Sequence, residues 1–216
     1  MPFSMEKFER TYDTEIFPIR IGKVSLSFHK PKSIDRFINP DDLMKGFPLW
    51  AKIWDASAVL TQYMAELEVD ATRRILELGS GIGVAGITAA CLGHQITLTE
   101  HNADALEFLK ANAELNQCQH IPIHHLDWFK PRLTGSFDLI VGSEIVYQKE
   151  AVAALGDLFQ KYLAPNGQVV LVERVRSTGA EFFEKMADKF HIRVQKRTLR
   201  SKNKSEAVVL FDMCLK

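Results

Sequence analysis

The chain has 216 residues, of which 46% are hydrophobic, so it is long enough to bury one large core. Its 27 Lys and Arg residues balance its 27 Asp and Glu residues, which leaves no overall field to attract nucleic acids. The first residues alternate in charge where a secretory leader needs an apolar core, and no apolar run approaches the roughly 18 residues of a membrane span. We therefore expect a cytoplasmic protein that binds neither membrane nor nucleic acid.

The chain has three cysteines: Cys91, Cys118 and Cys214. Their odd number and wide spacing fit neither a disulfide framework nor a zinc site, so we expect small buried hydrophobic side chains. Histidines at 120, 124 and 125 are close in sequence. Because adjacent strand residues face opposite sides, no metal site is expected there.

The first 70 residues differ in pattern from the rest. Apolar positions alternate on both sides of Gly22 and predict a β-hairpin over about residues 15–31. From Asp55 the pattern becomes that of an amphipathic helix. Its predicted inward face consists of Val59, Leu60, Tyr63, Met64 and Leu67. We expect residues 1–70 to form an extension, a hairpin plus a helix, that packs on a core domain of residues 71–216.

From residue 73 onward, short β-rich runs alternate with helical periods. Runs with the dense apolar character of strands covered on both faces lie at 73–79, 95–100, 121–127, 137–143 and 168–174. Helical periods lie at 102–116, where Asn102 is a candidate cap, at 150–167, and at 180–190. This alternation predicts a doubly wound α/β domain with a mostly parallel sheet.

The end of the chain predicts a different strand arrangement. Residues 191–200 and 207–216 have strand character and are separated by a polar turn at 201–206. They predict an antiparallel hairpin that closes a seven-stranded sheet.

The stretch 73–86, RRILELGSGIGVAG, is an apolar run that ends in an acid and continues into four glycines. Gly81, Gly83 and Gly86 match the G-x-G-x-x-G fingerprint of dinucleotide-binding proteins. Gly79, Gly81 and Gly83 match the E-x-G-x-G-x-G turn of S-adenosylmethionine (SAM) methyltransferases. The glycines alone do not choose between the two cofactors.

The acid before the glycines helps to choose. A helix from about residue 84 would point its positive N-terminus at the ligand. With NAD that ligand group is a pyrophosphate, beside which the carboxylate of Glu77 fits badly. With SAM it is a carboxylate, and Glu77 can position the cofactor's ammonium. A dehydrogenase would also normally need a further domain for its substrate.

Acids and an aromatic residue follow the next two predicted strands. Glu100 ends the second strand, where its two oxygens can accept hydrogen bonds from ribose hydroxyls. Asp127 and Trp128 end the third strand and offer an acceptor for an adenine amino group and an aromatic wall. Together with the glycine turn they predict a nucleoside site.

This order of features resembles the protein-methyltransferase branch of the seven-β-strand SAM enzymes, often called methyltransferase family 16. The similar segments are PLWAKIWDASAVL, ILELGSGIGVAGI, TLTEHN, LDWF and FDLIVGSEIVY, within residues 48–147. The resemblance implies a Rossmann-like fold, SAM as cofactor and lysine side chains of proteins as acceptors. Histidine methylation occurs in related enzymes.

The resemblance also assigns residues. The implied cofactor-binding residues are Trp54, Glu77, Gly79, Ser80, Gly81, Gly83, Glu100, Asp127, Trp128 and Ser143. Trp50 adds a second aromatic ring beside Trp54 at the entrance of the predicted cofactor site.

The family's D-x-x-Y signature appears here as residues 144–147, with Glu144 in place of the usual aspartate. One extra methylene moves a carboxylate by about 1.5 Å, which affects the acceptor site more than the fold. Glu144 and Tyr147 are the predicted catalytic residues: Glu144 would orient the acceptor cation, and Tyr147 would form an aromatic wall. Nucleic-acid amino-methylating enzymes usually have N/D-P-P-Y/F in this position, where this chain has SEIVY.

The sequence therefore predicts a SAM-dependent N-methyltransferase that acts on a lysine of a cytosolic protein. Two alternatives remain open: a small-molecule N-methyltransferase, and a non-catalytic SAM-binding module that regulates a partner. Basic residues between 193 and 204 could contact an acidic partner, but a solvated hairpin is the better explanation of them.

Overall fold

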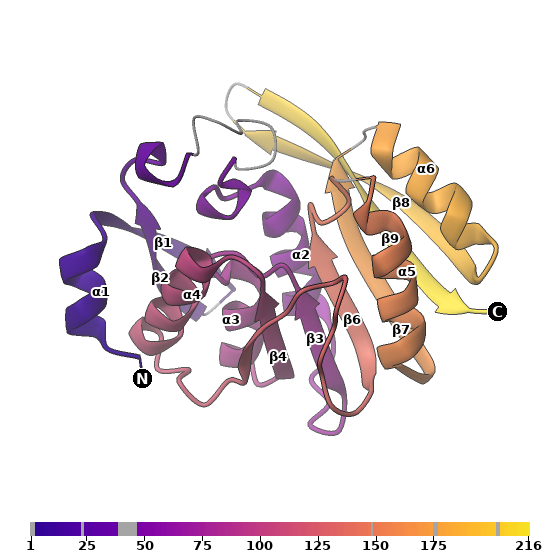
Figure 1. Ribbon diagram of the computed structural model, residues 1–216, viewed down its shortest axis with the longest axis horizontal. Helices are drawn as coiled ribbons and strands as arrows, with labels where there is room; N and C mark the ends of the chain where they lie inside the picture. Colours follow the sequence, from indigo (N-terminus) through magenta and orange to yellow (C-terminus); the bar gives the residue numbers. More distant parts are fainter. Residues whose placement is uncertain (1–2, 23, 39–46, 148, 175–176, 202–203) are drawn as a thin grey trace.

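The computed structural model describes residues 3–22, 24–38, 47–147, 149–174, 177–201 and 204–216. Its main sheet has seven strands in the order β5-β4-β3-β6-β7-β9-β8 (Figure 1). The five parallel strands are β3 (Arg74–Leu78), β4 (Gln95–Glu100), β5 (Ile123–His125), β6 (Phe137–Ser143) and β7 (Leu163–Arg174). The antiparallel hairpin consists of β8 (Phe190–Ser201) and β9 (Lys204–Leu215). The predicted α/β fold, mostly parallel with an antiparallel C-terminal hairpin, is confirmed.

Two boundaries differ from the prediction. The hairpin strands extend into the predicted turn at 201–206, because Arg200 pairs with Ser205 and Ser201 pairs with Lys204; residues 202–203 lie outside the described residues. Strand β7 begins at Leu163, before the Pro165–Gly167 turn, and its register against β6 shifts there. In the hairpin, backbone pairing therefore continues into the predicted turn, whereas on β7 the pairing with β6 passes from Leu163 to Gln168 across residues 165–167.

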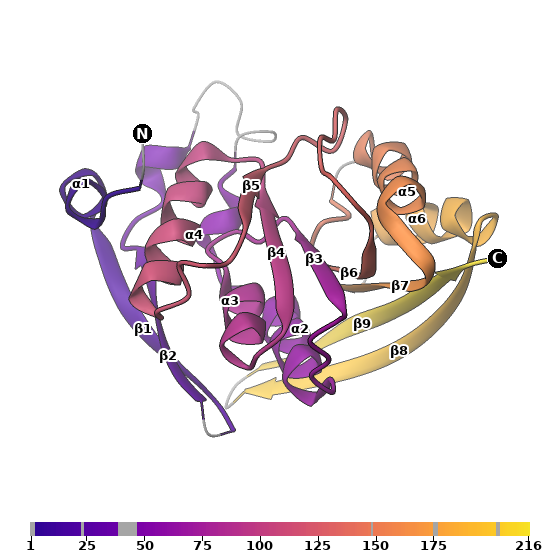
Figure 2. The ribbon, with the colours of Figure 1, turned by 90° about the horizontal axis from the view of Figure 1, so that it is seen from below.

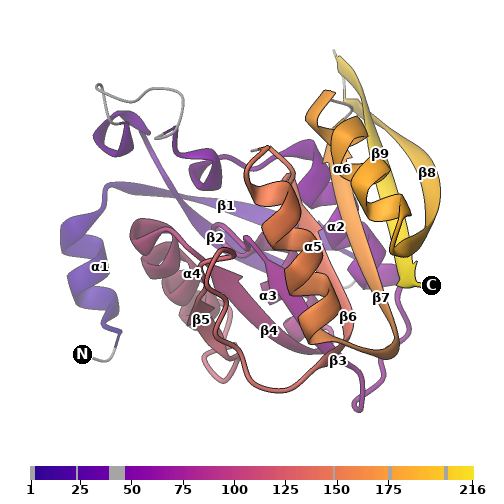
Figure 3. The same cartoon turned by 45° about the vertical axis from the view of Figure 1, so that its right-hand side comes forward.

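Helices cover both faces of the sheet and enclose two apolar cores. On one face lie α2 (Asp55–Glu66), α3 (Val84–Cys91) and α4 (Ala103–Leu115). On the other face lie α5 (Ala151–Tyr162) and α6 (Ser177–Ala187), which stand beside each other in Figure 3. The central strands β3, β4, β6 and β7 are therefore mostly buried on both sides, which explains the dense apolar runs of the sequence.

The N-terminal residues add α1 (Met5–Thr11), β1 (Thr14–Ile21) and β2 (Val24–Pro31). Strands β1 and β2 form the predicted hairpin, and β2 lies along α4 (Figure 2). Helix α1 was not predicted from the sequence; Ser4 caps it, and its Phe8 packs edge-on against Phe108 of α4. Two short 3-10 turns, η1 (Asp35–Phe37) and η2 (Leu49–Ala51), precede α2.

A buried amide connects this extension to the cofactor turn. The side chain of Asn112 on α4 accepts a hydrogen bond from the His29 backbone N at 2.6 Å and donates to the His29 carbonyl at 3.1 Å. It also donates to the Ile82 carbonyl at 2.8 Å. Because a buried amide is costly when unpaired, Asn112 fixes the glycine turn relative to β2 and α4.

Among the described residues, no helix has both the length and the apolar character required to cross a membrane.

Candidate active site

A cavity of about 760 Å³ opens at the carboxyl ends of β3, β4 and β6. It brings together most of the residues that the sequence predicted: Trp50, Trp54, Glu77, Gly79, Ser80, Gly81, Glu100, Asp127, Trp128, Ser143, Glu144 and Tyr147. Gly83 is not on its wall. Gly83 is the N-cap residue of α3, and a Cβ there would collide with Leu109 of α4, so this glycine allows close helix packing.

The glycine turn forms the floor of the cavity. Gly81 has φ of 56°, a left-handed conformation that side chains rarely adopt, and a Cβ there would lie 3.3 Å from the Trp50 carbonyl oxygen. Gly86 is required for a different reason, because its Cβ would collide with the Glu77 carboxylate. Both glycine signatures therefore have structural causes, and the Gly86 match reflects the space that Glu77 occupies.

Glu77 is 3% exposed, and within the described part of the chain its Oε2 atom has no hydrogen-bond partner. The Ser80 hydroxyl lies beside this carboxylate. Burial raises the pKa of Glu77 to about 7, and the charge of Glu100 acts in the same direction. A buried carboxylate with a free oxygen on a cavity wall suits a cationic ligand group. The cofactor ammonium predicted from the sequence can donate hydrogen bonds to this carboxylate, whereas the carboxylate would repel a pyrophosphate.

Glu100 holds the neighbouring loops together. Its Oε2 atom accepts a hydrogen bond from the Gly81 backbone N at 2.9 Å. Its Oε1 atom accepts from the backbone N atoms of His101 at 2.7 Å and Asn102 at 2.9 Å. Glu100 therefore links the end of β4 to the glycine turn, a role in addition to the predicted contact with ribose.

Glu100→Gln should weaken cofactor binding roughly 10- to 100-fold and leave the fold intact. An amide has one acceptor oxygen where Glu100 uses two, so at least one backbone N–H loses its partner, at a cost of about 1–3 kcal/mol. Isothermal titration with SAM would measure the loss. Glu107→Gln is the matched control, because Glu107 lies on α4 with a partly exposed carboxylate that pairs with Lys110; equal affinity in the two variants would contradict this role.

Aromatic and charged side chains form the wall on the side of α2. Trp54 precedes α2 and donates from Nε1 to the Leu49 carbonyl at 2.8 Å. The Arg174 guanidinium lies 4.5 Å from the centre of the Trp54 ring. Trp50 packs on Phe37 and Phe108, with ring centres 4.8 and 5.4 Å apart. Both tryptophans thus lie at the cavity as predicted, held by different neighbours.

The Glu144 carboxylate does not stand alone in the cavity. Its Oε1 atom accepts from the Arg174 backbone N at 2.7 Å, and its Oε2 atom accepts from Arg174 Nε at 3.1 Å. Its side chain is 7% exposed, and its backbone has φ of 55°. The predicted direct contact of Glu144 with an acceptor remains a prediction, and the structure shows that its carboxylate is paired with Arg174.

Besides Glu144, the structure shows an acid on β7 that was not predicted. Glu173 is 3% exposed and accepts hydrogen bonds through Oε1 from the backbone N atoms of Ile145 at 2.9 Å and Val146 at 3.1 Å. It fixes the segment between Glu144 and Tyr147. The available signal was an acid inside the apolar strand run QVVLVER, which is unusual unless its charge is paired.

The remaining predicted residues occupy the opposite wall. Asp127 accepts through Oδ1 from the Phe129 backbone N at 2.9 Å, and Trp128 packs near Gly79. Ser143, at the end of β6, is half-buried. Tyr147 lies at the mouth, where loss of hydration, together with the charge of Glu100, raises its pKa, so its hydroxyl keeps its proton at neutral pH.

The mouth of the cavity has an apolar rim. Its members, with their exposed fractions, are Phe47 (37%), Ile53 (39%), Phe129 (58%) and Tyr147 (38%). Among the described residues, these are four of the eight large hydrophobic side chains that are exposed. Clustering of this kind is typical of a surface that another macromolecule covers.

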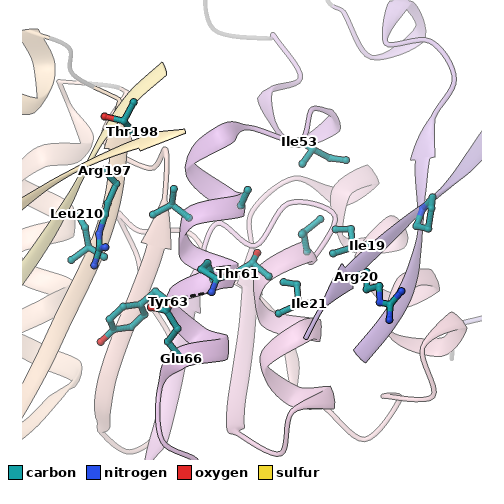
Figure 4. Close-up of a pocket in the computed structure, with 15 residues that line it drawn as sticks. Ile19, Arg20, Ile21, Ile53, Thr61, Tyr63, Glu66, Arg197, Thr198 and Leu210 are labelled. Atoms are coloured by element: carbon teal, nitrogen blue, oxygen red, sulfur yellow. Dashed lines mark hydrogen bonds between the residues drawn. The ribbon is translucent and has the colours of Figure 1, made fainter. Parts of the chain in front are cut away.

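A second cavity of about 600 Å³ adjoins the first beside α2 (Figure 4). Ile19 and Ile21 of β1 lie on one side of it, and Arg197 and Leu210 of the C-terminal hairpin lie on the other. Ile53 borders both cavities. None of the predicted cofactor residues lines this second cavity.

Comparison with known proteins agrees with this site. A family model described as lysine methyltransferase matches residues 45–189. Protein N-lysine methyltransferase METTL21A of Mus musculus is 34% identical over 165 residues, 69% of this chain and 73% of its own length. METTL21A of Danio rerio is 34% identical over 182 residues, covering 80% of this chain and 82% of its own.

A solved SAM-dependent methyltransferase from Agrobacterium tumefaciens has the same fold, with a TM-score of 0.64 at 18% identity, covering 93% of this chain and 70% of its own. The family match extends across the glycine turn, Glu100 and the segment after β6, which are the parts of the chain that build the cavity. The chain therefore belongs to the lysine methyltransferase family and is a methyltransferase whose cofactor is S-adenosylmethionine.

Proposed function

We propose that this protein methylates a lysine side chain of a cytoplasmic protein. The apolar rim of the cavity is the observation that supports a protein acceptor most strongly. A small amine needs only a route into the cavity, whereas four exposed apolar side chains around the mouth offer area for a macromolecule. At Ile53 the rim continues into the second cavity, which extends this area. The relatives named above are protein N-lysine methyltransferases, in agreement with the proposal.

When bound, SAM would supply a methyl group on a sulfonium: the amine nitrogen would bond to the methyl carbon as the carbon–sulfur bond breaks and the neutral thioether leaves, which requires no acid, metal or covalent enzyme intermediate. The residues proposed to hold it are the predicted cofactor set. Glu77 would hold its ammonium, Glu100 its ribose, and Asp127 with Trp128 its adenine. Gly83 would contribute through the position of α3 and not through contact. The protein's main contribution is then to position the acceptor nitrogen.

The acceptor nitrogen must lose a proton before it can attack, because a free lysine has a pKa of about 10.4. A lone carboxylate would hold the amine as its ammonium and raise that pKa further. The Arg174 guanidinium offsets the charge of Glu144. We propose that this pairing lets Glu144 orient the amine with less stabilisation of its charged form. Tyr147 and Trp54 provide the aromatic surfaces beside it.

Glu144→Gln should lower the rate of methyl transfer roughly 10- to 100-fold and change SAM affinity less than about twofold. The amide keeps the shape of the side chain but loses its charge and its charge-assisted bond to Arg174. Initial rates on a protein acceptor and SAM titration would separate the two quantities. Asp138→Asn is the matched control, since Asp138 also pairs with an arginine, Arg74, but at the other end of β6. Full activity of Glu144→Gln would remove this residue from the acceptor site.

The proposal is tested by incubating the purified protein with methyl-labelled SAM and a lysate from a strain that lacks it. We expect a discrete labelled protein with the wild type, and no such labelled protein with Glu144→Gln after the same short incubation. Label only in the small-molecule fraction would support a small-amine acceptor instead. Measured SAM binding with no label in any fraction would indicate a regulatory, non-catalytic module.

A further inference from the structure

Two cysteines that are distant in sequence meet where α3 and α4 end. Cys91 is the last residue of α3, and Cys118 follows α4. Their Sγ atoms lie 2.7 Å apart, and both are free thiols. Small buried hydrophobic side chains were predicted at these positions, because the spacing in sequence gave no sign of this contact.

The surrounding backbone holds the two thiols in place. Gln117 adopts a left-handed conformation with φ of 60°, which turns the chain back after α4. The Cys118 backbone N donates to the Ala113 carbonyl at 2.7 Å. Asn116 is tied to β2, because its side chain accepts from the Ser27 backbone N at 3.1 Å and donates to the Ser27 carbonyl at 2.7 Å. Hydrogen bonds therefore hold the turn that carries Cys118 in place beside Cys91.

We infer that Cys91 and Cys118 are a site of reversible disulfide formation, and that a disulfide oxidant such as glutathione disulfide couples them. In the first step Cys91 Sγ, after losing its proton, attacks one sulfur of glutathione disulfide and releases one glutathione thiolate. Cys118 Sγ then loses its proton, attacks Cys91 Sγ and releases the second glutathione. The two cysteines lose two electrons and two protons, which reduce the oxidant to two glutathione thiols.

Accessibility assigns the order of the two steps. Cys91 is half-buried, whereas Cys118 is 4% exposed, so an external disulfide reaches Cys91 first. Burial, with the hydrogen bond to Cys118, raises the pKa of Cys91 to about 12. Because the thiolate is the attacking form, coupling should be slow at neutral pH and faster at alkaline pH. Once Cys91 carries glutathione, the adjacent Cys118 should resolve it quickly.

The bond would stabilise the part of the molecule that holds the cofactor. It would join the ends of α3 and α4, and the segment between the two cysteines contains Glu100 and the α4 cap Asn102. A disulfide that closes this segment into a loop lowers the conformational entropy of the unfolded chain and so stabilises the folded state. We expect the midpoint of thermal unfolding to rise by roughly 5–10 °C on oxidation and to return on reduction with dithiothreitol. This inference does not depend on the acceptor of methyl transfer.

Peptide mapping tests the site without any substitution. The protein is incubated with glutathione disulfide at mildly alkaline pH, alkylated and digested with trypsin. Trypsin cleaves after Lys110, so Cys91 and Cys118 fall on different peptides, residues 75–110 and 111–132. We expect these two peptides to be joined, with the loss of two hydrogen atoms in the intact mass. Full alkylation of both cysteines, a stable glutathione adduct on Cys91, or a link to Cys214 would each overturn the inference.

Variants give a second, independent measurement. Cys214→Ser is the matched control and should keep both the joined peptides and the rise in unfolding temperature. Cys91→Ser should lose both, and because Cys91 is half-buried this change is mild enough to leave the reduced protein folded. An equal rise in unfolding temperature in Cys91→Ser and wild type would contradict the inference.

Discussion

Gly81→Arg is expected to abolish cofactor binding, with the SAM dissociation constant raised at least roughly 100-fold. Gly81 combines three constraints on the cavity floor. Its φ of 56° disfavours any side chain, and its Cβ would lie 3.3 Å from the Trp50 carbonyl oxygen. Its backbone N donates to Glu100. A long side chain at this position must either fill the cavity or displace the turn.

Gly22→Arg is the matched control for this substitution. Gly22 lies in the N-terminal hairpin with nearly the same backbone, φ of 55°, but no atom of the described residues lies within 4 Å of the position that a Cβ would take there. Both variants therefore carry similar backbone strain, and only Gly81→Arg obstructs the cavity. Thermal unfolding with and without SAM would show a ligand-induced shift in Gly22→Arg and none in Gly81→Arg. Normal SAM affinity in Gly81→Arg would contradict the placement of the cofactor.

SAM affinity is expected to fall roughly tenfold for each pH unit below about 7, because Glu77 must be ionised to hold a cation. In the unfolded chain the Glu77 carboxyl has its ordinary pKa of 4.5, whereas burial raises the folded value to about 7. Folding therefore opposes ionisation, and this group lowers the stability of the ligand-free protein as the pH rises from 4.5 to 7. A bound ammonium reverses the preference, so binding near pH 7 should release a proton.

Calorimetric titration in two buffers with different heats of ionisation measures that released proton directly. Glu77→Gln is the informative variant, since it keeps the side-chain shape but cannot titrate. It should bind SAM more weakly at pH 8 and show a much flatter pH dependence than the wild type. A wild-type affinity that stays constant between pH 5.5 and pH 8 would rule out this role of Glu77.

Much of the fold could be predicted because its signals are local. The central strands are covered on both faces, so each appears as a dense apolar run. Asn102 caps α4 as predicted, since its Oδ1 atom accepts a hydrogen bond from the Ala105 backbone N. The glycine turn is visible because positive φ and close approach restrict it to glycine. Helix α1 was missed because its stability rests on Phe8, which packs against a distant helix.

The site was harder to predict where its contacts join distant segments. Glu144 and Arg174 are 30 residues apart, and nothing in the signature around Glu144 indicates that its charge is already paired. The Cys91 and Cys118 thiols meet where Gln117 adopts a left-handed backbone conformation. A glutamine in the sequence does not predict that conformation. Gly83 was assigned to the cofactor by its spacing, yet the packing of α4 on α3 requires it. In each case tertiary packing gives the residue its partner.

The most direct test of the account is the identity of the residue that receives the methyl group. The labelled protein from the lysate assay is isolated, hydrolysed to amino acids and separated against methyllysine and methylhistidine standards. We predict label in methyllysine, and no label in a parallel reaction with Gly81→Arg. Label in methylhistidine, or label recovered only in free small amines, would contradict it.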